Sequence, residues 1–69
     1  MEKATRFSKA TRVEVGMTGI IGQVKAGSII RERGRSLEVY TVAITDDPHK
    51  ALHGSTEETF YGSSLVTAG

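Results

Sequence analysis

The sequence predicts a mainly β protein: an antiparallel four-stranded meander within a single small domain, residues 1–69. Two observations predict it. Apolar and polar residues alternate over several short stretches, which is typical of strands. Clusters of glycine, proline and aspartate separate these stretches, as turns do. No segment has the apolar spacing of an amphipathic helix, and a chain of 69 residues is too short for more than one domain.

The first two predicted strands are separated by glycines. Residues 11–18 alternate, with Val13, Val15 and Met17 on one side. Gly19 and Gly22 bracket two isoleucines and predict a bend or bulge. The second strand is expected over residues 23–32.

The third strand, residues 36–45, is expected to form a hairpin with the second. The turn lies at Gly34-Arg35 or at Arg33-Gly34, and both choices give the same two faces. One face would carry Val24, Ala26, Ser28, Ile30, Leu37, Val39, Thr41 and Ala43. The other would carry Gly27, Ile29, Tyr40, Val42 and Ile44, with Lys25, Arg31 and Glu38. With the turn at Gly34-Arg35, Arg31 lies opposite Glu38 and can pair with it across the strands. Because both faces are apolar near the middle, we expect both to be covered there.

The rest of the chain supplies one more strand and two tails. Residues 46–50 form a turn by composition, because Pro48 cannot donate a hydrogen bond to a strand and aspartates bond nearby backbone. A fourth strand is expected over residues 51–61. Residues 1–10 and 62–69 are expected to fray.

Composition indicates that the domain assembles with itself. The chain has only five Ile, six Val, three Leu, two Met, two Phe and two Tyr, and no Trp. A domain of this size buries only about 60% of its unfolded surface and usually needs further stabilisation. There is no cysteine, and two isolated histidines do not make a zinc site. A homo-oligomer is therefore expected.

Charge and hydropathy indicate which classes of partner and which cellular compartment to expect. The net charge of +1 gives no strong electrostatic case for nucleic acid or a membrane surface. The sequence has no apolar run long enough to span a membrane and no apolar signal-peptide core. We therefore expect a cytoplasmic protein with no membrane association and no cofactor.

Few residues are candidates for a site. Arg31, Arg33 and Arg35 cluster at the hairpin tip, where they are either a phosphate-binding rim or a solvated strand end. His49 and His53 lack a metal-ligand context. Glu58 is either a buried acid with a raised pKa or an exposed strand residue. The serines lie outside any nucleophile motif, and no phosphate-cradling loop is present.

Parts of the sequence resemble a known enzyme family. Residues 22–47 read as a strand ending in basic residues, a Gly-Arg pair, and a strand closing on the acidic Asp46-Asp47 turn. Residues 50–60 follow as a strand ending in Thr59-Phe60, and residues 11–18 precede the hairpin. Over residues 11–61 this resembles the sheet half of a hotdog-fold thioesterase of the phenylacetate-degradation type. The family's long central helix and its His-Gly-Gly-type stretch are missing, so no catalytic residue carries across.

The resemblance implies a hotdog-like sheet without the helix, completed by oligomerisation. It also implies a ligand, since the basic tip in such dimers lies near the nucleotide end of coenzyme A. Arg33 and Arg35, with Arg31, then become phosphate contacts, and the expected function is binding of acyl-coenzyme A thioesters, with hydrolysis left open. Two alternatives remain. One is a non-enzymatic β-sheet oligomer that acts as an interaction module. The other is a nucleic-acid-binding β module that uses these arginines with Lys3, Arg6 and Lys9.

Overall fold

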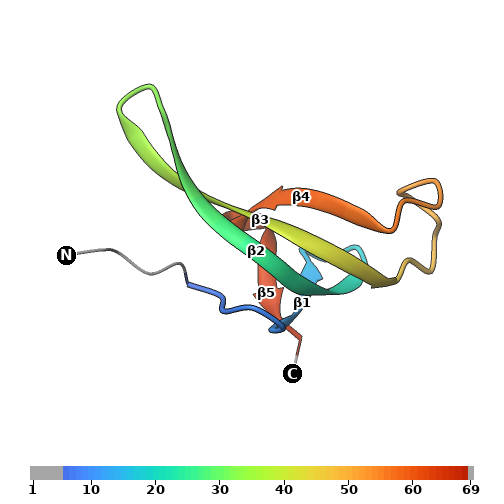
Figure 1. The fold of residues 1–69 in the computed structure, drawn as a ribbon. Coiled ribbons are helices and arrows are strands. Elements are labelled where there is room, and N and C mark those ends of the chain that lie inside the picture. The colour runs from blue at the N-terminus through green and yellow to red at the C-terminus, as the bar shows by residue number, and fades with distance from the viewer. Residues whose placement is uncertain (1–5, 69) are drawn as a thin grey trace.

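A computed structural model describes residues 6–68, which form one antiparallel sheet (Figure 1). The elements are β1 (Arg12–Val15), β2 (Ile21–Glu32), β3 (Arg35–Asp46), β4 (Glu57–Tyr61), the 3-10 turn η1 (Gly62–Ser64) and β5 (Leu65–Thr67). Their order across the sheet is β4-β3-β2-β1-β5. The prediction of a mainly β, antiparallel protein is confirmed. The described residues contain a fifth strand, which pairs with the first, in addition to the predicted meander of four.

The β2–β3 hairpin turns at Arg33-Gly34, where both residues have positive φ, 53° and 76°. Two positive φ angles are what a type I′ turn requires, and glycine accepts this conformation at no steric cost. Glu32 pairs with Arg35 at the base of the turn. Of the two turn positions that the sequence left open, Gly34-Arg35 and Arg33-Gly34, the structure has Arg33-Gly34.

A β-bulge at Lys25 changes the predicted faces at one end of the hairpin. Ala26 pairs with Thr41 as expected for one face, but Val24 pairs with Val42 after a register shift. The extra residue turns Val24 to the side of Val42, and both are buried. The prediction that Val24 shares the face of Ala26 was wrong, because strict alternation does not anticipate an inserted residue.

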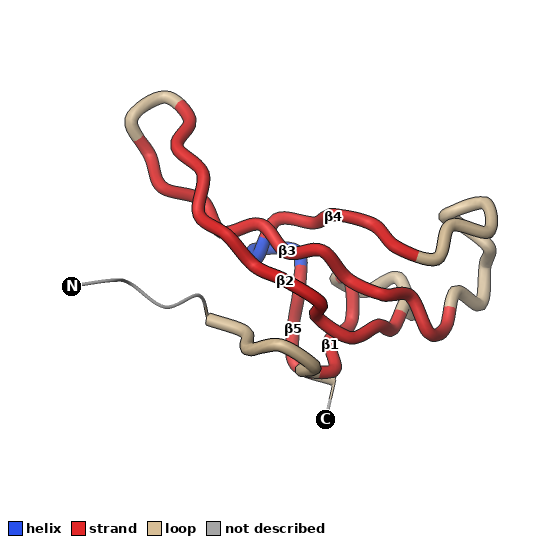
Figure 2. The backbone as a smooth tube through the Cα atoms, in the orientation of Figure 1, coloured by secondary structure: helices blue, strands red, loops and turns tan. Residues whose placement is uncertain are grey.

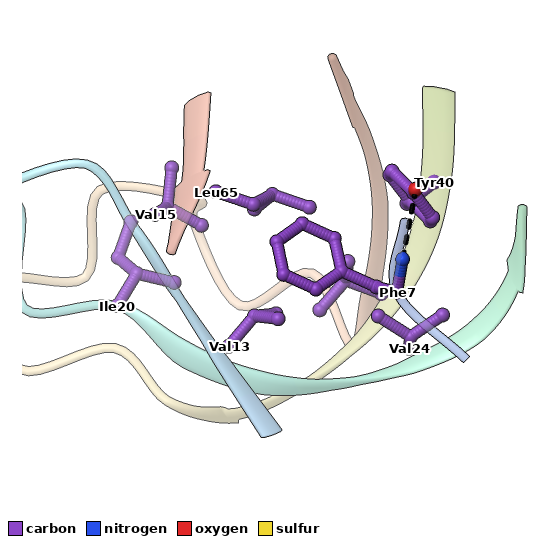
Figure 3. Packing of buried hydrophobic residues seen from close by; sticks show 8 residues of the cluster. Phe7, Val13, Val15, Ile20, Val24, Tyr40 and Leu65 are labelled. Atoms are coloured by element: carbon purple, nitrogen blue, oxygen red, sulfur yellow. Dashed lines mark hydrogen bonds between the residues drawn. The ribbon is translucent and has the colours of Figure 1, made fainter. Parts of the chain in front are cut away.

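The core lies on one side of this bent sheet (Figure 3). It contains Phe7, Val13, Val15, Ile20, Val24, Tyr40, Val42 and Leu65. Gly22 allows two strands to approach closely beside it: a Cβ at this position would lie 2.5 Å from the carbonyl oxygen of Ala43 and from Cγ1 of Val42. We call the side that holds the core the inner face and the opposite side the outer face.

The prediction that both ends fray was wrong for the residues that the structure describes. Leu65 begins β5, pairs with Val15 and is 2% exposed. At the other end Phe7 is 7% exposed and packs edge-on against Tyr40, with ring centroids 5.2 Å apart. Apolar side chains from both ends fill the concave side of the sheet, which the hairpin alone cannot fill. Residues 1–5 and 69, also assigned to the tails, lie outside the described residues.

Two predicted strands are shorter than expected. The strand predicted over residues 51–61 forms only from Glu57, and turns occupy residues 48–54. The carboxylate of Asp47 holds this loop by accepting hydrogen bonds from the backbone N–H groups of Ala51 and Leu52. The first strand ends at Val15, so Met17 lies in a turn and is fully exposed. Its spacing had predicted that Met17 shares the buried side of Val13 and Val15, and this prediction was wrong.

The far end of the hairpin extends beyond both neighbouring strands. Pairing of β3 with β4 ends at Val39, opposite Tyr61, and pairing of β2 with β1 ends at Gln23. Residues 28–38 therefore form a two-stranded projection, which we call the hairpin arm (Figures 1 and 2). From Val39 to the turn at Arg33 the arm spans roughly 20 Å at the usual rise per strand residue.

Candidate functional site

The three arginine side chains of the tip do not form one cluster. Arg33 and Arg35 line a shallow hollow at the end of the arm, together with Glu32 and Leu37. Arg31 pairs with Ser36, one position away from the Glu32–Arg35 pair, so its side chain lies on the opposite face of the strand. The structure therefore brings together two of the predicted phosphate contacts and separates the third.

Four apolar side chains lie on the outer face of the arm and of the strands at its base; Tyr61 is exposed, and the other three are half-buried. Ile30 pairs with Leu37, and Val39 pairs with Tyr61, which places these four side chains on the outer face. Ile30, Val39 and Tyr61 line one depression. Tyr61 is 46% exposed, although it is among the largest apolar side chains of the protein. The alternation in residues 51–61 indicated a face for Tyr61, but its place beside Val39 depends on the β3–β4 register.

The inner side of the arm's base carries a hydrogen-bond network instead of the predicted Arg31–Glu38 pair. Glu38 lies opposite Ile29, and its carboxylate accepts hydrogen bonds from the Tyr40 hydroxyl, 2.7 Å away, and from the backbone N–H of Arg6. The Arg31 prediction was wrong because the observed turn shifts the pairing by two positions. This network uses the carboxylate of Glu38 to fix the N-terminal segment, and the hydroxyl of Tyr40 accepts from the N–H of Phe7 at 3.1 Å.

Charge is unevenly distributed along the hairpin. The tip carries three arginines and one carboxylate, Glu32. The opposite end, with the adjoining loop and β4, carries four carboxylates and two lysines: Asp46, Asp47, Glu57, Glu58, Lys25 and Lys50. Lys25 and Glu57 form an ion pair there, and their side chains remain 55% and 45% exposed. The sheet therefore has a basic end at the hairpin tip and an acidic end, formed mainly by β4 and the loop before it.

The remaining sequence candidates do not form a catalytic arrangement among residues 6–68. His49 and His53 are exposed in the loop before β4. Glu58 is half-buried opposite Val42. No group of three potential metal ligands occurs in the described part of the chain, and the core there contains no charged side chain. No described residue is therefore assigned a catalytic role.

Three of the four aromatic rings pack in or against the core. Tyr40 is fully buried, Phe7 nearly so, and Phe60 is half-buried against the core. Arg6 lies over the Phe7 ring, 4.4 Å from its centroid, and its guanidinium donates to the carbonyl oxygen of Gly62 at 2.6 Å. Of the four aromatic residues, Tyr61 alone is exposed. A surface on which several nucleic-acid bases could stack is therefore lacking in residues 6–68.

Comparison with known proteins identifies no relative: no family model, curated protein or solved structure matches the chain. Within residues 6–68 there is also no helix of the length and apolar character needed to cross a membrane.

Proposed function

We propose that this protein is a non-enzymatic interaction module that self-associates through its hairpin arm. The observation that carries the proposal is the apolar group on the outer face at the arm and its base, in which Tyr61 is 46% exposed and the other three side chains are half-buried. Surfaces of this kind mark protein interaction sites, because apolar side chains left in water gain free energy when a partner covers them. Ile30, Leu37, Val39 and Tyr61 are the side chains that such a partner would cover.

The small core supports the same proposal. Eight buried apolar residues hold the described chain together. A domain with so small a core gains stability from association, since binding to the folded state alone shifts the folding equilibrium.

The test is the molar mass in solution, measured by light scattering on a size-exclusion column over a dilution series. The expected mass is a multiple of the 7.4 kDa chain mass. Tyr61→Ser should weaken association, while Val66→Ser should not. Val66 is a matched control because it is 52% exposed but lies on β5, away from the arm. A monomeric wild-type protein at its highest soluble concentration would refute the proposal.

A second candidate function is binding of acyl-coenzyme A at the arm tip. The observation in its favour is the hollow lined by Arg33, Arg35, Leu37 and Glu32, which holds two guanidinium groups, the side chains best suited to phosphate, beside one carboxylate and one apolar side chain. Calorimetry with coenzyme A should detect binding that Arg33→Ala abolishes. Arg31→Ala is the matched control, since Arg31 lies on the other face. Absence of heat at roughly millimolar ligand, a weak-binding concentration, would remove this candidate.

A further inference from the structure

We infer that the partner on the outer face is a second copy of this chain, packed antiparallel about a two-fold axis near Val39. In this arrangement Arg35 of each copy contacts Glu57 of the other. The inference rests on the proposed self-association and adds the face, the orientation and the charged contact.

The register of the sheet supplies the geometry. Arg35 and Ala43 lie four residues to either side of Val39 on β3, about 13 Å away in each direction. Residues separated by even numbers share a face, so Arg35, Val39 and Ala43 all belong to the outer face. Glu57 is the β4 partner of Ala43. An antiparallel rotation about Val39 therefore brings Arg35 of one copy over the Ala43–Glu57 position of the other.

Charge favours this orientation over a parallel one. On the outer face, a parallel arrangement would place the Arg35 side chains of the two copies together and the Glu57 side chains together, and such like-charge contacts are unfavourable. The antiparallel arrangement places each Arg35, which lies opposite Glu32 of its own chain, beside Glu57 of the other copy. Because the interface is two-fold, every favourable contact occurs twice. Glu57 already pairs with Lys25, but its 45% exposure leaves the carboxylate accessible from outside.

The apolar centre lies between these charged contacts. Val39 and its β4 neighbour Tyr61 are nearest the axis, and Ile30 and Leu37 lie between the axis and the tip. Two sheets that pack face to face bury such side chains in a layer about 10 Å thick. Pairing along a free strand edge is the competing arrangement, and β4, β5 and the part of β2 beyond β1 each offer one. Along β2 two features disfavour it. The bulge at Lys25 and the charge of Arg31 oppose it, since both features hinder strand addition at an edge.

Charge reversal tests the contact directly. The dimer dissociation constant is measured for the wild type, Arg35→Glu, Glu57→Arg and the double variant, by sedimentation in about 0.15 M salt. Each single reversal should raise the dissociation constant at least tenfold, because it turns two attractive contacts into two repulsive ones. The double variant should return to within about threefold of the wild type. Arg31→Glu, with the same charge change on the inner face, should differ from the wild type by less than about threefold. Circular dichroism verifies that each variant is folded.

The outcomes separate this inference from the function on which it rests. A wild-type dimer in which Arg35→Glu and Arg31→Glu weaken association equally would overturn the choice of face. A double variant that stays as weak as the single variants would overturn the Arg35–Glu57 contact. In both cases self-association itself would stand. A wild-type monomer would overturn the inference and the proposed function together.

Discussion

Leu65 provides the sharpest test of the fold, because it lies in a segment whose sequence suggests a frayed tail. The perturbation is Leu65→Ala. The side chain is 2% exposed and packs in the core beside Val15, its pairing partner on β1. Removing a buried leucine side chain costs about 2–5 kcal/mol, since both the burial and the packing around it are lost. A chain of 69 residues has a total stability of roughly 3–10 kcal/mol, so the loss is a large part of it.

Urea unfolding followed by far-ultraviolet circular dichroism measures this loss, with all variants at one protein concentration because association affects stability. In a thermal scan followed by the same signal, a loss of about 3 kcal/mol should lower the melting temperature by roughly 12–24 °C. The control is Val66→Ala, on the same strand but 52% exposed, which should change stability by less than about 0.5 kcal/mol. Equal effects of the two substitutions would refute the placement of β5 in the core.

Three further substitutions test separate contacts by the same unfolding measurement. Tyr40→Phe should cost about 2 kcal/mol, because the buried hydroxyl donates to the carboxylate of Glu38; no change would contradict that bond. Gly22→Ala should cost about 1–3 kcal/mol, since its Cβ would lie 2.5 Å from a β3 carbonyl oxygen; an unchanged midpoint would argue against this close approach. Lys25→Ala should cost less than about 1 kcal/mol, and the difference should shrink at high salt, because its pair with Glu57 is exposed; a larger, salt-independent loss would indicate another role for Lys25.

The hairpin was the most predictable part of the fold. Alternation of side chains from Ala26 to Ile30 and from Leu37 to Ala43, with Gly34 between them, defines two strands and a turn without any tertiary information. The sequence does not indicate that a bulge falls at Lys25. It depends on how β1 and the segment before it pack against Val24, and those contacts join residues far apart in the chain.

The candidate site was predictable only in composition. The three arginines of the tip are visible in the sequence, and alternation alone places Arg31; whether Arg33 or Arg35 belongs to a strand depends on which residues form the turn. The position of Glu57 relative to Arg35 depends on the pairing of β3 with β4 after a ten-residue connection. A loop of that length does not fix a register, so no local pattern indicates that the two residues share the outer face.

The strand class, the hairpin and its basic tip can all be derived from the sequence, because they depend on side-chain alternation and turn chemistry between near neighbours. The tertiary structure decided that both ends join the core. A short segment such as residues 65–67 carries too few residues to signal a strand, and it forms one because β1 offers an edge and the core accepts Leu65. The tertiary structure also sets which apolar residues stay exposed: Tyr40 is buried on the inner face, whereas Tyr61, opposite the half-buried Val39 on the outer face, is 46% exposed.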